Sequence, residues 1–182
     1  MAFVAPALLT LACLGAGALL LFVFRLLSDW SYVEKIGFSF AIGFGVVGWL
    51  FFWLGTVGWL SQEAAWIVCG LLALGLLSLR RNFILNLTSI KFSALEWLLF
   101  GLIAVVMAAD FLEALAPPVE ADSLAYHFQL PKQFIEEGRL VFVPRALDGA
   151  VPLLVQMTYV AALLLGGNED IALTLWTFIS SW

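Results

Sequence analysis

Two long stretches of this sequence carry no charged residue, and they limit the folds that the chain can adopt. No Lys, Arg, Asp or Glu occurs between Met1 and Arg25, or between Lys35 and Glu63. A helix needs about 20 apolar residues to cross the hydrocarbon core of a bilayer, and both stretches are long enough. The sequence therefore predicts helices that lie inside a membrane.

The composition agrees with this prediction. Hydrophobic residues make up 64% of the 182 residues, against 8 Lys+Arg and 13 Asp+Glu, whereas a soluble domain of this length needs a more polar surface. No basic patch of the kind that binds nucleic acid occurs. Cys13 and Cys69 fall inside apolar segments, where a thiol packs as a small hydrophobic group, so neither a disulfide nor a cysteine metal site is expected.

We expect an all-α, polytopic transmembrane bundle with five to six spans and a helical extracytoplasmic loop. Residues 1–116 hold the first spans, residues 117–150 form the loop, and residues 151–182 hold further spans. The last segment stops at Trp182 with no polar residue after it, so the chain is expected to be the N-terminal part of a longer protein. The candidate spans are 3–24, 36–60, 64–79, 97–115, 151–165 and 171–182.

The positive-inside rule orients these spans. Arg25 and Lys35 flank the first connection, and Arg80, Arg81 and Lys91 lie in the third, whereas the second connection has no basic residue. Connections one and three are therefore predicted to be cytoplasmic. The N-terminus and the loop at 116–150 are then extracytoplasmic.

Two further patterns concern packing and the membrane surface. Residues 82–96 place apolar side chains at helical spacing among charged ones, which predicts an amphipathic helix in the cytoplasmic interface. A match to the dinucleotide fingerprint G-x-G-x-x-G is formed by Gly43-Phe44-Gly45-Val46-Val47-Gly48. Because that fingerprint acts only at a strand-to-helix turn, we interpret these glycines as sites of close helix approach.

The loop at 117–150 is expected to be helical in part. Pro117-Pro118 ends the preceding span, since proline disfavours helix at its own position and before it. A short helix is predicted from 124 to 130, and a second with Pro131 in its first turn and Gly138 at its end. The membrane-facing side chains of these two helices would be Leu124, Phe128, Phe134 and Ile135.

Asp122 is the leading candidate for chemistry in this loop. A carboxylate at a membrane–water boundary can act as a general base, and with Glu120 it could share a divalent cation such as Mg²⁺ or Mn²⁺. The alternative role for Asp122 is the N-cap of the helix that follows.

Other polar residues are candidates for supporting or substrate-binding roles, and each has a structural alternative. His127, the only His, could bind a phosphate oxygen or simply make a hydrogen bond, and Tyr126 precedes it. The cations could bind phosphate, or they could be solvated or contact lipid headgroups; they are Lys132, Arg139 and Arg145. Asp110 lies in an apolar run, where an acid is either functional or reaches the interface.

The pattern from 110 to 159 resembles the first extracytoplasmic loop of bacterial polytopic glycosyltransferases of the GT-C superfamily, including mannosyltransferases and lipid A aminoarabinose transferases. The matching residues are Pro117-Pro118, Asp122-x-Leu124-x-Tyr126-His127, Leu130-Pro131-Lys132, Glu137-Gly138-Arg139-Leu140 and Pro152.

This resemblance implies a location in the bacterial cell membrane. It also implies sugar transfer from a polyprenyl-phosphate donor to an acceptor at the outer membrane face, with Asp122 as base or metal ligand and Glu120 as a possible second acid. Such a transfer needs a carboxylate to take the acceptor's proton and cations to hold the leaving phosphate. The alternative is a non-catalytic multi-pass membrane protein, such as a transporter piece or an assembly subunit that binds lipid.

Overall fold

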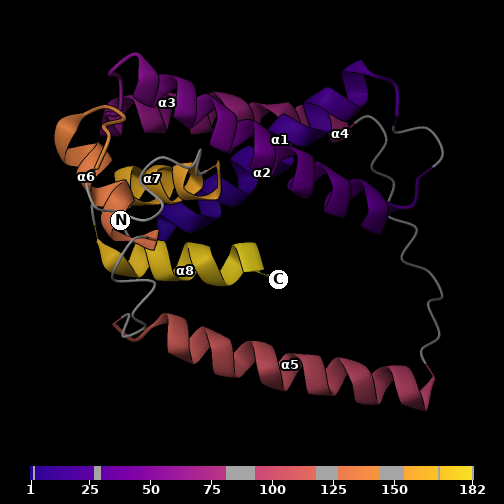
Figure 1. Cartoon of the computed structure of the whole chain (residues 1–182). Coiled ribbons are helices and arrows are strands. Elements are labelled where there is room, and N and C mark those ends of the chain that lie inside the picture. Colours follow the sequence, from indigo (N-terminus) through magenta and orange to yellow (C-terminus); the bar gives the residue numbers. More distant parts are fainter. Residues whose placement is uncertain are drawn as a thin grey trace.

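All regular structure in the described part of the chain is helical. The computed structural model describes residues 1, 3–26, 30–80, 93–117, 127–143, 154–167 and 169–181. The predicted all-α class is therefore confirmed for these residues. Figure 1 shows most of the helices stacked side by side, with one long helix standing apart.

The first half of the chain forms an antiparallel set of helices. α1 (Val4–Val23) and α2 (Tyr32–Thr56) pack along each other, and α3 (Gln62–Ala73) packs on α1. A 3-10 turn, η1 (Leu74–Leu76), joins α3 to the short helix α4 (Leu77–Arg80).

The second half adds one peripheral helix and a central hairpin. α5 (Ala94–Ala114) packs mainly on α8 (Asp170–Ser181) and otherwise lies apart from the bundle (Figure 1). α6 (Gln129–Glu137) lies across one end of the bundle, and α7 (Leu154–Gly166) runs through its centre. We name the end that carries α6, the α2–α3 turn and the α7–α8 turn the α6 end.

Serine residues begin the two long helices that start at the opposite end. Ser31 and Glu34 form a capping box at the start of α2, in which the Glu34 carboxylate accepts from the Ser31 N–H at 2.7 Å. Ser93 and Glu96 repeat this arrangement at the start of α5. Each box satisfies amide groups that a helix N-terminus leaves unpaired. Residues 94–96 thus form the first turn of α5, while 82–92 lie outside the described residues.

Glycines allow the central helices to approach each other closely, and two of the three fingerprint glycines that were predicted to do so lie at such contacts. A Cβ at Gly43 would overlap the carbonyl oxygen of Cys13 in α1, and a Cβ at Gly48 would lie 2.5 Å from the Leu154 oxygen. A Cβ at Gly45 would meet no atom within 4 Å. The packing interpretation is confirmed for Gly43 and Gly48, and Gly45 is not a contact position.

The expectation of five to six spans is wrong. Among the described residues, only α1, α2 and α5, with 20, 25 and 21 residues, are long and apolar enough to cross a membrane. The predicted span at 64–79 is divided among α3, η1 and α4, and those at 151–165 and 171–182 form α7 and α8, whose 13 and 12 described residues extend only about 20 and 18 Å. Apolar composition made these segments resemble spans, but helix length decides whether one can cross a core of about 30 Å. Three candidate spans suggest a multi-pass membrane protein.

α6 matches its predicted limits but not its predicted surroundings. Pro131 lies in its first turn, and Gly138 ends it in the left-handed conformation with a φ of 64°. The side chains of Phe128 and Phe134, predicted to face the membrane, are buried in the protein core, and Ile135 packs against that core. The amphipathic pattern was correct, but the apolar side of the helix covers the bundle instead of lipid.

α7 starts within the bundle. Its first residue, Leu154, lies against Gly48, which precedes the end of α2 by eight residues, or about 12 Å. Its last residue, Gly166, lies beside Ala5 at the start of α1. Nearly the whole of α7 is buried, from Gln156 to Gly166.

Candidate functional site

The α6 end of the bundle gathers several polar side chains from segments that are distant in sequence. Lys132 of α6 pairs with Asp170, the first residue of α8, with 2.6 Å between Nζ and Oδ1. The two side chains are 36% and 47% exposed. Because ion pairs so exposed contribute little to stability, this contact can open at low cost when a competing anion arrives.

His127 and Gln156 form a second contact close to the start of α6. Gln156 Nε2 lies 3.0 Å from His127 Nδ1, and because an amide nitrogen only donates, the ring proton is placed on Nε2. The Gln156 side chain belongs to the first turn of α7 and is buried. The neighbouring Phe128 meets Tyr159 of α7 edge-on, with ring centroids 6.3 Å apart. The His127–Gln156 and Phe128–Tyr159 contacts join the predicted loop to α7.

A small open pocket of about 270 Å³ lies where the end of α5 meets the start of α8. Thr174 of α8 donates a hydrogen bond to the Ala114 carbonyl at 2.6 Å and so holds these two helices together. The pocket is lined by Leu115, Ala116, Pro117, Asp170, Ile171 and Thr174. Since Asp170 also pairs with Lys132, the pocket and the ion pair adjoin each other.

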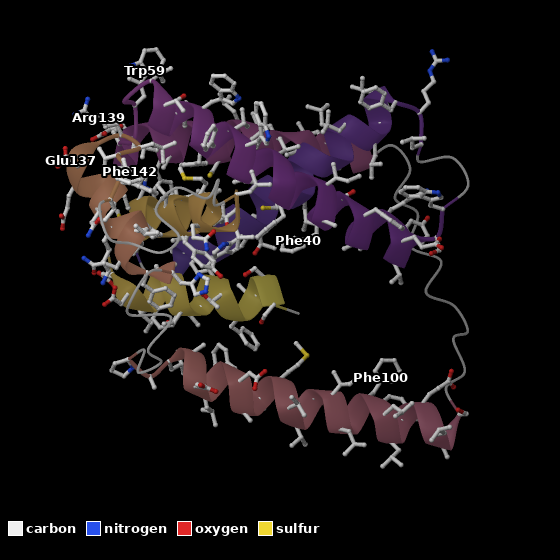
Figure 2. All side chains as sticks on the ribbon, in the orientation of Figure 1. Phe40, Trp59, Phe100, Glu137, Arg139 and Phe142 are labelled. Atoms are coloured by element: carbon white, nitrogen blue, oxygen red, sulfur yellow. The ribbon has the colours of Figure 1, made fainter. Side chains whose placement is uncertain are left out.

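Arg139 and Asp110 lie apart from these contacts. Arg139 follows Gly138 at the end of α6, and its side chain is exposed at the outer edge of the α6 end together with Glu137 (Figure 2). Asp110 lies one turn before the end of α5, is partly buried and does not line the pocket. Within the described ranges neither side chain has an ion pair.

Several predicted site residues lie outside the described residues: Glu120, Asp122, Tyr126 and Arg145. The proposed acid pair and its divalent cation therefore stay predictions. Among the residues that the structure does describe, no three His, Cys, Asp or Glu side chains are grouped as metal ligands would be.

Three polar residues of this region were missed in the sequence. Gln156 is a lone amide in the apolar segment 151–165, and such a residue inside a membrane segment is a usable signal. Asp170 and Thr174 begin the last apolar segment, where their roles depend on contacts with Lys132 and Ala114 that lie 38 and 60 residues away.

The described part of the site can hold a proton and an anion. Lys132 can offer its ammonium group to a phosphate if it leaves Asp170, and His127 offers a ring nitrogen. Both residues already contact the protein, so their present roles include fastening α6 to α7 and α8. Comparison of the chain with known protein families, curated proteins and solved structures found no match.

Proposed function

We propose that the chain belongs to a glycosyltransferase similar to the GT-C superfamily, which transfers a sugar from a polyprenyl-phosphate donor at one membrane face. One observation carries this proposal: two stretches with candidate residues end at a shared contact. The stretch with Glu120, Asp122 and Tyr126 ends at His127, and the stretch with Arg145 ends at α7, where Gln156 contacts His127.

The surroundings of this contact suit a lipid-linked substrate. The neighbouring ion pair of Lys132 and Asp170 lies near one end of an apolar bundle, where a headgroup could meet water while its chain stays in the membrane. Pro117 precedes Asp122 by five residues and lines the pocket beside Asp170. The described residue before the Asp122 stretch thus lies beside Asp170, the ion-pair partner of Lys132.

The proposed reaction is a single displacement. An acceptor hydroxyl attacks the anomeric carbon of the sugar, a new C–O bond forms, and the bond from that carbon to the phosphate oxygen breaks. Asp122 takes the hydroxyl proton, and the polyprenyl phosphate leaves with the bonding electron pair. Lys132 would leave Asp170 and pair with the leaving phosphate, whose negative charge it would balance.

Asp122→Asn tests the base directly. Loss of a general base lowers rates by about 10²- to 10⁴-fold, so transfer in proteoliposomes should fall by that factor while membrane insertion is unchanged. The donors would be polyprenyl-phosphate mannose, glucose and aminoarabinose, with release of polyprenyl phosphate as readout. Glu137→Gln, an exposed acid at the same end of the bundle, is the matched control and should retain the parental rate.

The results separate the proposal from its alternatives. Full activity of Asp122→Asn would remove Asp122 from the mechanism, and activity after exhaustive chelation would exclude a divalent cation. No turnover of any donor by the parental protein would favour a non-catalytic membrane protein. That second candidate is supported by the contacts that His127 and Lys132 already make with Gln156 and Asp170.

A further inference from the structure

The described part of α7 is too short to cross a bilayer and yet lies in the centre of the bundle. Its 13 residues extend about 20 Å, against a hydrocarbon core of about 30 Å. A helix at the surface could be short without consequence. α7 instead contacts α1, α2, α3, α6 and α8, and its residues from Gln156 to Gly166 are buried.

The last residues that the structure describes before α7 lie at the α6 end. The Leu140 N–H, just past α6, donates to the Gly55 carbonyl at 2.9 Å, one residue before the end of α2. The Leu60 N–H of the α2–α3 turn donates to the Gly138 carbonyl at 3.1 Å. In Figure 2, Arg139 and Phe142 lie at the same end of the bundle as Trp59.

The chain also leaves α7 at the α6 end. Gly166 lies beside Ala5 in the first turn of α1, and a Cβ at Gly167 would lie 3.9 Å from the Gln62 amide nitrogen in the first turn of α3. The start of α7 lies deeper, against Gly48, which is about 24 Å from the Tyr32 end of α2. The described residues on either side of α7 therefore share one end of the bundle.

We infer that α7 is a re-entrant helix, so that Phe142 and the α7–α8 turn face the same side of the membrane. This inference does not depend on the proposed function. It changes the topology expected from the sequence, in which 151–165 crosses the membrane and the turn near 167–169 lies on the opposite side from the loop at 117–150.

The packing of α7 suits a re-entrant helix. Lipid cannot satisfy the free N–H groups at a helix start, so a helix that begins at membrane depth must be enclosed by protein or open to a water-filled cavity. Five helices enclose α7 from Gln156 onward, and its first two residues, Leu154 and Val155, are 37% and 43% exposed. A hydrogen bond also joins the two helices of the α7–α8 hairpin, because Trp176 Nε1 of α8 donates to Thr158 Oγ1 of α7 at 2.9 Å. Thr158 and Trp176 each lie nine residues from Gly167.

Cysteine accessibility tests the inference in the full chain. The background is Cys13→Ala with Cys69→Ala, which removes two buried thiols. Single cysteines replace Phe142, which is 71% exposed and precedes α7, and the exposed Glu169, which follows α7. A membrane-impermeant maleimide is applied to sealed vesicles of each orientation and, as a measure of total thiol, to detergent-solubilised protein.

Two reference cysteines define the faces. Trp59→Cys, in a residue 69% exposed, marks the α6 end, and Val33→Cys, in a residue 79% exposed, marks the other end. We expect Phe142→Cys and Glu169→Cys to be labelled from the Trp59→Cys side and protected from the other. Labelling of Glu169→Cys from the Val33→Cys side, or from both sides, would overturn the inference. Asp170→Cys repeats the turn measurement if Glu169→Cys fails to insert.

Discussion

The crossing of α1 and α2 allows a sharp prediction from two glycines on one helix. A Cβ at Gly43 would overlap the Cys13 carbonyl oxygen, which is backbone and cannot rotate away, whereas a Cβ at Gly45 meets nothing within 4 Å. Carbon–oxygen contacts at helix crossings lie near ~3.3–3.6 Å, so Gly43→Ala would push the helices apart by roughly 2 Å. Overpacking of this kind costs about 1–3 kcal/mol.

Gly45→Ala is the matched control because both substitutions gain the same helix propensity, about 0.8–1 kcal/mol. That gain cancels in the comparison, and Gly43→Ala should be less stable than Gly45→Ala by the packing cost alone, about 1–3 kcal/mol. The measurement is unfolding of the two variants in the same detergent by SDS titration or heat. Equal stability of the two variants would refute the close crossing of α1 and α2.

Three further outcomes follow from side-chain contacts. Thr158→Val leaves the buried Trp176 N–H without an acceptor and should destabilise the protein by about 1–3 kcal/mol in detergent unfolding, whereas Thr158→Ser should not. Lys132→Met removes an exposed ion pair and should change stability by less than ~1 kcal/mol, and a larger loss would show a structural role. His127→Ala and Gln156→Leu should be non-additive by about 1 kcal/mol in a double-mutant cycle; simple additivity would contradict their contact.

Local chemistry made much of α6 predictable. Proline is tolerated in the first turn of a helix and glycine at its end, so Pro131 and Gly138 mark α6 without knowledge of any neighbour. Its environment was not predictable. Phe128 and Phe134 cover protein because α7 lies beneath them, and the contact of Phe128 with Tyr159 joins residues 31 positions apart.

The candidate site, like α6, could be predicted from the sequence only in part. Its position after an apolar span and the polar residues His127 and Lys132 can be found from the sequence, since polar groups beside a membrane segment are unusual. Their partners cannot be found there. Gln156 and Asp170 reach them only through the α7–α8 hairpin, and nothing in the spacing of the residues encodes that pairing.

The sequence alone determined that this protein is helical and apolar enough for a membrane, because uncharged stretches of more than 20 residues admit few other structures. It also identified Gly43 and Gly48 as packing positions, although it included Gly45, where a Cβ would contact nothing. Only the tertiary structure decided which apolar segments can span. α7 and a span share the same composition, and what distinguishes them is length and position: a 13-residue helix that begins beside Gly48 and ends beside Ala5 is enclosed by its neighbours instead of crossing with them.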